Sequence, residues 1–340
     1  MKRICIAASL LAIGACGNPV ESDGTAPDQV TPLGFEPSEL ATDTRPQDDF
    51  FAYVNGLWIE RTEIPAEWSR YGTMQIVHER TEARVRALIE TAAADTEAPA
   101  GSDVRKIGDL YRSFMNEARA DSLGLEPIAD DLKAIDALDS YDELIVYFAH
   151  AMINGVQVPV KFYIDANAAD PDTTLAYFWQ DGLGLPDRDY YLRDTDELIS
   201  VREQYALHIE RLFTLAGWPD GPAAARLIPA LEQRIAVLHW SRVQNRDREK
   251  IYTNKYTLEE ADALSPGFPW LAFLEAGGFG QPGQIIIAQT EYFSALGKLV
   301  RDTPLDTWRA YLRLHTLKSF APYLNDNIVR ENFNFEKRTL

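Results

Sequence analysis

The sequence predicts a mainly helical fold with a few short β-strands. Three observations point to it. Apolar residues recur at helical spacing in several segments, Ser and Thr residues stand in capping positions before them, and only short stretches alternate as strands do. Of the 340 residues, 46% are hydrophobic and 25% are charged. This ordinary globular composition provides enough chain for one large domain or two modest ones.

The first residues have the pattern of an export signal. Residues 1–15 begin with two basic residues and continue with an apolar run at residues 4–13, which is too short to span a bilayer. The I-G-A-C sequence that ends at Cys16 resembles a bacterial lipobox, so we expect Cys16 to be the lipid attachment site. An ordinary signal peptide with an incidental cysteine is the alternative. By resemblance to Gram-negative lipoproteins, Gly17 favours the periplasmic face of the outer membrane if the source is Gram-negative.

Composition then separates a tether from a body. Residues 16–45 are rich in Pro, Asp, Thr, Ser and Gly without periodicity, which is typical of a flexible tether, and the body is expected at residues 46–340. The formal net charge of -19 repels phosphate groups, so we expect no nucleic-acid partner. The only cysteines are Cys5 and Cys16. With Cys5 removed and Cys16 acylated, the body would contain no disulfide.

The helices are predicted from their caps and apolar faces, in chain order. Ser102 caps a helix whose apolar residues, from Val104 to Phe114, share one face. The S-Y-D-E sequence at residues 140–143 is a capping box before a second helix. Further helices are expected at about residues 198–217, at about residues 222–242, after the Thr257 capping box, and after Thr303-Pro304.

Three stretches are expected to be extended. Residues 156–164 alternate and are rich in β-branched residues, and residues 174–180 could pair with them across the polar loop at residues 167–172. Residues 284–288 are predicted to form a third short strand.

Residues that could perform catalysis are few. None of the five histidines belongs to an H-E-x-x-H motif, and in the similar run that starts at His78, Glu82 stands where the second His is needed. His78 and Glu82 could form at most a weak two-ligand site, against the simpler interpretation as exposed helical residues. There is no G-x-S-x-G motif. We therefore expect no catalytic residue and no metal site in this chain, and interpret the other histidines as packing or surface residues: His150, His208, His239 and His315.

A resemblance to a known family rests on residues 48–72. They read D-D-F-F-A-Y-V-N-G-L-W-I-E-R-T-E-I-P-A-E-W-S-R-Y-G and resemble the N-terminal segment of the neprilysin family of zinc metallopeptidases, which includes endothelin-converting enzyme and bacterial oligopeptidases. Further motifs follow in the order of the family at residues 182–191, 245–258, 266–270 and 311–335. Ordered matches along most of the chain make the resemblance specific.

The resemblance implies a fold and two lobes with different roles. In the family, the N-terminal half builds most of a helical lobe that covers a thermolysin-like catalytic lobe and encloses a chamber for peptides. This chain would be that covering lobe, mainly α with a few short strands, and the catalytic lobe with its H-E-x-x-H motif would be missing from it. Zinc is accordingly expected as the cofactor of the complete parent enzyme and not as a ligand of this chain.

The resemblance also implies one substrate-binding residue, Arg70. The Arg of the family's R-Y-G run binds the primed side of the peptide, and a planar guanidinium suits a carboxylate or carbonyl. Better-known members place an Asp five residues later, where this chain has Gln75, which leaves the selectivity of the subsite open. The alternative is a structural ion pair of Arg70.

Three functions remain from the sequence. The first is a lipid-anchored zinc metalloendopeptidase that hydrolyses oligopeptides in the bacterial cell envelope, of which this chain is the N-terminal part and inactive alone. The second is a non-catalytic envelope lipoprotein that binds peptides or a partner, and the third is a purely structural one. In every case we expect membrane attachment through the lipid anchor, and apolar helical faces that lie bare where the missing lobe would sit.

Overall fold

A computed structural model describes residues 37–66 and 68–340. The predicted signal at residues 1–15 and the predicted lipid site Cys16 lie outside these residues, as does most of the predicted tether. The chain divides into two compact units, Met1–Leu88 and Ile89–Leu340, and each is described by itself.

The described part of the first unit is helical. It contains the short helix η1 (Pro37–Glu39), α1 (Phe50–Arg61) and most of α2 (Thr73–Ala94), which continues into the second unit. Helix α1 begins at an N-cap, because the Asp49 carboxylate accepts the backbone N–H of Ala52 at 2.8 Å.

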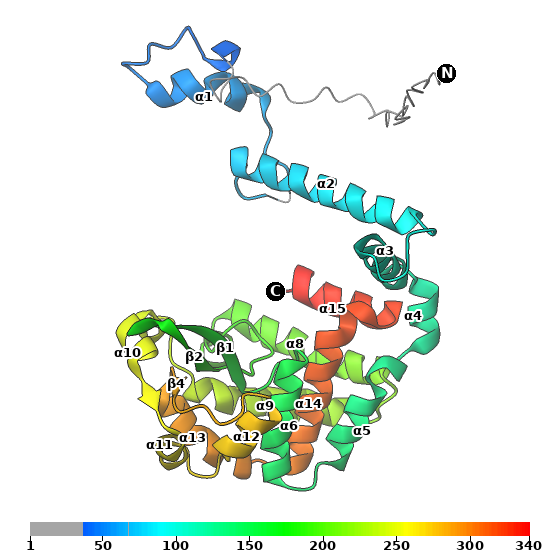
Figure 1. The fold of residues 1–340 in the computed structure, drawn as a ribbon, viewed down its shortest axis with the longest axis vertical. Helices are drawn as coiled ribbons and strands as arrows, with labels where there is room; N and C mark the ends of the chain where they lie inside the picture. The colour runs from blue at the N-terminus through cyan, green and yellow to red at the C-terminus, as the bar shows by residue number, and fades with distance from the viewer. Residues whose placement is uncertain (1–36, 67) are drawn as a thin grey trace, which may run out of the picture. The chain divides into compact units, whose positions relative to one another are not determined.

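The second unit is a helical body with one small sheet at its side (Figure 1). Helices α8, α9 and α14 pack against one another in its centre, and α6 packs against α14. The α-helices beyond α2 are α3 (Asp103–Phe114), α4 (Glu117–Leu123), α5 (Ala129–Ala137), α6 (Tyr141–Ile153), α7 (Asp189–Leu192), α8 (Asp196–Leu215), α9 (Gly221–Leu238), α10 (Arg248–Thr253), α11 (Leu258–Leu264), α12 (Trp270–Ala276), α13 (Thr290–Arg301), α14 (Leu305–Phe320) and α15 (Asp326–Arg338). The 3₁₀ helices are η2 (Glu126–Ile128), η3 (Gln244–Arg246) and η4 (Ala321–Tyr323).

The sheet has four strands in the order β1-β2-β4-β3. β1 (Val160–Asn167) and β2 (Asp170–Gln180) form the predicted antiparallel hairpin. β4 (Ile285–Ile287) is the predicted third strand, and it runs parallel to β2 because the helices between them carry the chain across. β3 (Lys255–Tyr256) was not predicted, since two residues are too short for a periodic signal.

Aromatic contacts tie the helices of the body together. In α6, Phe148 is fully buried and meets the ring of Trp308 from α14 edge to face, with 5.4 Å between the ring centroids. At the other side of the body, α15 packs on α8, where the Phe335 ring stacks on the imidazole of His208 at 4.4 Å. Helix α15, near the C-terminal end of the described chain, is therefore held on the body.

The predicted helix caps are confirmed with one difference. Ser102 and Thr257 cap α3 and α11, and Thr257 forms a full reciprocal box. Ser140 caps α6, but the Glu143 carboxylate accepts the N–H of Asp139 and not that of Ser140.

The predicted end of the helix near residue 242 is wrong. α9 ends at Leu238 because His239 becomes extended and directs its ring Nε2 to the Asp181 carbonyl, at 3.1 Å. This contact joins His239 to a residue far away in the chain, which the local sequence pattern does not reveal.

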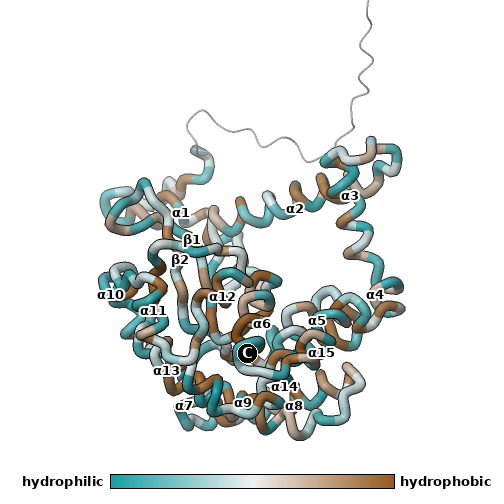
Figure 2. Tube along the Cα trace, turned by 60° about the horizontal axis from the view of Figure 1, so that its bottom comes forward, coloured by the Kyte–Doolittle hydropathy of each residue, from teal (hydrophilic) through white to brown (hydrophobic). Residues whose placement is uncertain are grey.

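The apolar face of α3 is real but uncovered. Leu110 is 73% exposed and Phe114 is 56% exposed, and Figure 2 shows apolar positions along this helix. The rings of Phe114 and Tyr323 meet edge to face, with their centroids 5.9 Å apart. None of the described helices is long and apolar enough to cross a membrane.

Candidate functional site

Arg70 lies in the loop between α1 and α2. Hydrogen bonds hold this loop both before and after Arg70. The Trp68 Nε1–H donates to one oxygen of the Glu79 carboxylate at 3.1 Å, and the Tyr71 hydroxyl donates to the other at 2.7 Å. The Tyr71 ring also stacks on Trp58 of α1, with centroids 6.5 Å apart. A single carboxylate on α2 therefore fixes the residues that flank Arg70.

The Arg70 side chain itself is exposed. Within residues 37–66 and 68–340, no hydrogen bond or ion pair joins its guanidinium to another residue. Gln75 is half-buried beside the backbone of Gly72. The first unit thus presents a fixed loop with an exposed guanidinium, which is the arrangement that binding of an external carboxylate requires.

A second polar site surrounds the G-L-G-L-P loop at residues 182–186 in the second unit. Gly182 has a φ of 95°, and a Cβ there would lie 2.8 Å from the Tyr311 hydroxyl. At Gly184 a Cβ would lie 1.8 Å from the Tyr205 hydroxyl, so a side chain cannot fit without displacing that ring. Both glycines are needed because the loop backbone lies directly on buried phenols.

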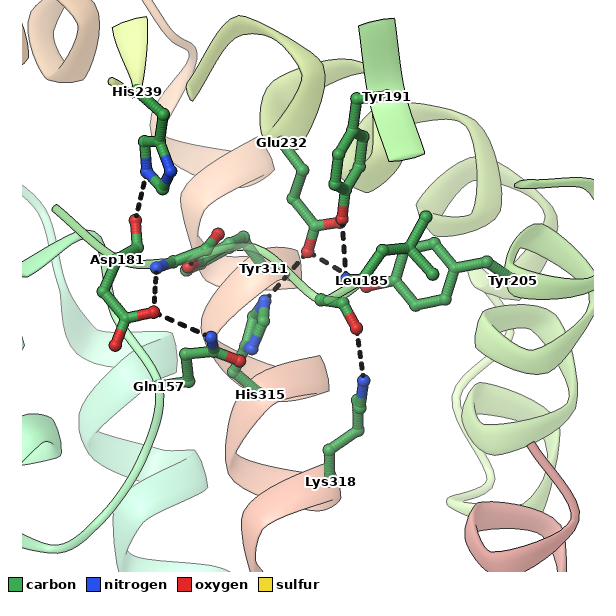
Figure 3. Close-up of polar contacts among 12 residues, drawn as sticks. Gln157, Asp181, Leu185, Tyr191, Tyr205, Glu232, His239, Tyr311, His315 and Lys318 are labelled. Atoms are coloured by element: carbon green, nitrogen blue, oxygen red, sulfur yellow. Dashed lines mark hydrogen bonds and ion pairs between the residues drawn. The ribbon is translucent and has the colours of Figure 1, made fainter. Parts of the chain in front are cut away.

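A fully buried carboxylate, that of Glu232 in α9, organises these phenols (Figure 3). It accepts hydrogen bonds from the Tyr191 hydroxyl at 2.7 Å and the Tyr205 hydroxyl at 3.0 Å, and the His315 Nε2 lies 3.0 Å from it. Burial, followed by the nearby Glu232 charge, raises the pKa values of both tyrosines well above the usual value. Both phenols therefore stay neutral donors to Glu232.

The network continues to the loop backbone. The Tyr191 oxygen accepts the N–H of Leu185 at 2.9 Å, and the Tyr311 hydroxyl donates to the Gly182 carbonyl at 2.9 Å. Lys318 of α14 donates to the Gly184 carbonyl at 3.1 Å. The loop is thus held in one conformation by hydrogen bonds to side chains of α7 and α14.

Above this loop lies an open pocket of about 530 Å³. Its lining combines the loop with the end of β2, the residue after α9, and the facing sides of α14 and α15. The polar side chains that line it are Gln157, Gln180, Asp181, Asp187, His239, His315, Lys318, Ser319, Asn332 and Glu336. Burial lowers the pKa of His239 to about 4, so its imidazole is neutral near pH 7.

The G-L-G-L-P motif is part of the run at residues 182–191 that resembles the family, but the sequence did not point to the residues beneath it. The close packing of its glycines indicates a structural role for the motif. Glu232 carried a usable signal, because it is an acidic residue within an apolar helical segment. Lys318 and Asp181 gave no sequence signal, because they reach the pocket from distant elements.

The histidines are distributed as follows. His78 is exposed and its Nε2 lies 3.3 Å from the Glu82 carboxylate, one helical turn away. His208 and His315 are buried within the body. Throughout the part of the chain that the structure describes, no three His, Cys, Asp or Glu side chains gather in a way that could hold a metal ion.

Comparison with known proteins gives consistent relatives. The profile of Peptidase family M13 matches residues 46–340. Endothelin-converting enzyme 1 of Mus musculus is 27% identical over 296 residues, which cover 82% of this chain and 37% of the mouse protein. Endothelin-converting enzyme-like 1 of Rattus norvegicus is 26% identical over 300 residues, with 82% and 37% covered.

Solved structures show the same fold. The zinc metalloprotease Zmp1 of Mycobacterium tuberculosis, in complex with an inhibitor, superimposes with a TM-score of 0.78 at 33% identity, over 90% of this chain and 47% of that one. PepO from Lactobacillus rhamnosis gives a TM-score of 0.66 at 19% identity, over 87% and 46%, which supports the fold alone. The chain thus spans less than half the length of these relatives.

These matches confirm the predicted fold class, a mainly helical lobe of the neprilysin type. The family profile covers residues 46–340, and the structural match covers 90% of the chain. The chain belongs to peptidase family M13, the neprilysin family of zinc metallopeptidases, and comprises its N-terminal region.

Proposed function

We propose that this chain is the N-terminal part of a zinc metalloendopeptidase that hydrolyses oligopeptides. The observation that carries the proposal is the family match along residues 46–340, together with the 33% identity to a mycobacterial zinc metalloprotease. Because the chain spans less than half of that relative, the catalytic apparatus of the complete enzyme is assigned to the remaining part.

The residues of this chain do not fit the zinc site. A catalytic zinc is held by three protein ligands, whereas the His78–Glu82 pair offers two exposed groups, and no sequence H-E-x-x-H is present. The residues of this chain instead bind and orient the peptide and limit the space around it.

The chain by itself should not cleave peptides. The test is the hydrolysis of quenched fluorescent peptides by this chain and by the complete enzyme, each with and without a chelator, with zinc content measured alongside. We expect activity that the chelator abolishes in the complete enzyme and none in the chain. Zinc bound one-to-one with cleavage by the chain would contradict the proposal, and an inactive complete protein would favour the alternative of a non-catalytic binding lipoprotein.

Arg70 is proposed to bind the carboxyl terminus of the peptide. Its exposed guanidinium lies on a loop that Trp68, Tyr71 and Glu79 hold, so little ordering is needed when a carboxylate binds. Arg70→Met in the complete enzyme should raise KM about tenfold for peptides with a free carboxyl terminus, the effect of losing a charge-assisted hydrogen bond, and raise it less for amidated peptides.

Arg84→Met is the matched control, because Arg84 is also an exposed arginine of the first unit. It should leave KM unchanged for both kinds of peptide. An equal effect of Arg70→Met on free and amidated peptides would exclude recognition of the carboxylate and favour a structural role.

We further propose that the protein is an exported lipoprotein of the bacterial cell envelope, anchored through Cys16. The support is the sequence pattern of residues 1–16. Mass spectrometry of the mature N-terminus should find a diacylated Cys16, and Cys16→Ser should release the protein from the membrane fraction. An unmodified mature N-terminus would argue for an ordinary signal peptide.

A further inference from the structure

We propose that the pocket above the G-L-G-L-P loop binds a positively charged group of a peptide, an arginine or lysine side chain or the α-ammonium group, with Asp181 as its counter-ion. The inference rests on the proposed function for the peptide itself and adds a second contact point, in the second unit. It depends on which charges of the pocket already have partners.

One of the side-chain carboxylates that line the pocket has no ion-pair partner among the described residues. The side-chain carboxylates that line it are those of Asp181, Asp187 and Glu336. Asp187 pairs with Arg242, and Glu336 pairs with Lys318 at 3.0 Å. No Lys, Arg or His of the described residues forms an ion pair with the Asp181 carboxylate, so this side chain lacks a cationic partner.

Hydrogen bonds within the protein hold the Asp181 carboxylate in a position where it can accept a cation. Its Oδ1 accepts the Gln157 amide at 2.9 Å and the Gly182 N–H at 2.8 Å, whereas Oδ2 has no hydrogen bond from the described residues (Figure 3). Its carbonyl oxygen lies 3.1 Å from His239 Nε2. One carboxylate oxygen is thus held by the protein while the other remains available for an external donor.

Other polar groups of the lining also offer acceptors. The Asn332 Oδ1 is buried and receives no hydrogen bond within the described part of the chain. Neutral His239 uses Nε2–H as a donor toward Asp181, which leaves its Nδ1 as an acceptor. An ammonium or guanidinium group has several donors and no acceptor, and so complements this set.

The pocket is large enough for such a group and rigid enough to select it. A volume of about 530 Å³ exceeds what one guanidinium needs and leaves room for adjoining peptide atoms. Its floor is the loop that Glu232, Tyr191 and Tyr311 hold in place. A fixed acceptor set costs little reorganisation when a cation binds.

The test is a ligand-observed NMR titration of this chain with short peptide amides. The probes are acetyl-Gly-Arg-Gly-amide, its citrulline analogue, which is neutral and has nearly the same shape, and Gly-Gly-Gly-amide with a free or an acetylated N-terminus. We expect the arginine peptide to bind about tenfold more tightly than the citrulline peptide, since one charge-assisted contact is lost. Preference for the free N-terminus instead would identify the α-ammonium as the cation.

Asp181→Asn separates charge from shape, because an amide oxygen can still accept from Gln157 and Gly182. It should abolish the preference for the charged probe. The matched control Asp172→Asn removes an exposed carboxylate from β2 and should leave the preference unchanged. No binding, equal binding of arginine and citrulline peptides, or an undiminished preference in Asp181→Asn would overturn the assignment, while chelator-sensitive hydrolysis by the complete enzyme would still support the proposed function.

Discussion

Helices α3 and α6 have the same sequence pattern and opposite surroundings. Each begins at a serine cap and carries one apolar face. In α6 that face is buried, and Leu144 and Phe148 are fully inaccessible. In α3 the equivalent face is open, with Leu110 at 73% exposure. Periodicity therefore predicts that a helix has an apolar face, but not that this chain covers it.

The other side of α3 explains its orientation. Gly108 lies so close to the end of α2 that a Cβ would be 2.4 Å from the Ala92 carbonyl oxygen. Arg112 donates to the Ala93 carbonyl, and Arg105 donates to the Thr96 carbonyl at 2.8 Å. These contacts hold α3 by its polar and glycine side and turn the apolar side outward, where it fits the uncovered surface expected from the sequence.

The largest difference in the free energy of unfolding should appear when one apolar residue is truncated in α6 and one in α3. Phe148→Ala leaves a cavity beside Trp308 and should lower the free energy of unfolding by about 3–5 kcal/mol, whereas Leu110→Ala should change it by less than about 0.5 kcal/mol. Urea denaturation followed by circular dichroism measures both. Similar losses for the two variants would mean that α3 is covered in solution.

Helix α15 differs from both α3 and α6, because polar contacts as well as apolar ones hold it on the body. The His208 Nδ1 lies 3.0 Å from Glu331, and its buried Nε2 has no partner among the described residues. Burial, and then the charges of Lys318 and Arg211, lower the pKa of His208 to about 3, so the folded protein holds a neutral imidazole there.

This neutral His208 predicts a pH dependence. The unfolded chain takes up the proton near pH 6.5 and the folded chain near pH 3, so stability is full above pH 6.5 and falls as the pH drops toward 3. The loss at pH 4 should be about 3 kcal/mol. His208→Phe keeps a ring against Phe335 and should flatten the curve of unfolding free energy against pH. A curve as steep as that of the original protein would exclude His208 as the cause, and His239 is present in both proteins as a common background.

A smaller effect is expected where α3 meets α2. Gly108→Ala forces the two helices apart and should cost about 1–3 kcal/mol locally. Hydrogen exchange should become faster in α3, while the amides of α6 keep their protection. Loss of protection in both helices would show that α3 and the body unfold as one cooperative unit.

The smallest effect on the free energy of unfolding is expected from polar replacements on the apolar face of α3. The same replacements should have a measurable effect on self-association. Replacing Leu110 and Phe114 together by Gln should change the free energy of unfolding by less than about 0.5 kcal/mol, because both side chains are already largely exposed. It should also reduce self-association in analytical ultracentrifugation, since an exposed apolar patch is removed. Unchanged self-association would indicate that another surface joins the copies.

Local rules explain which parts of the fold the sequence could predict. Ser102, Ser140 and Thr257 cap the helices where they were expected, because capping depends on neighbouring residues only. The β1–β2 hairpin follows from alternation and a polar loop for the same reason. The two-residue strand β3 and the early end of α9 could not be predicted, since each depends on a partner far away in the chain.

For the candidate sites, the sequence by itself determined the family, the Arg70 position and the G-L-G-L-P motif, because each is a short run of neighbouring residues. Only the tertiary structure decided that Glu232 lies beneath that motif and that Asp181, of the three side-chain carboxylates that line the pocket, has no cationic partner among the described residues. The physical reason is that burial and charge compensation are sums over groups from distant segments. A one-dimensional pattern contains the groups, but folding decides which of them meet.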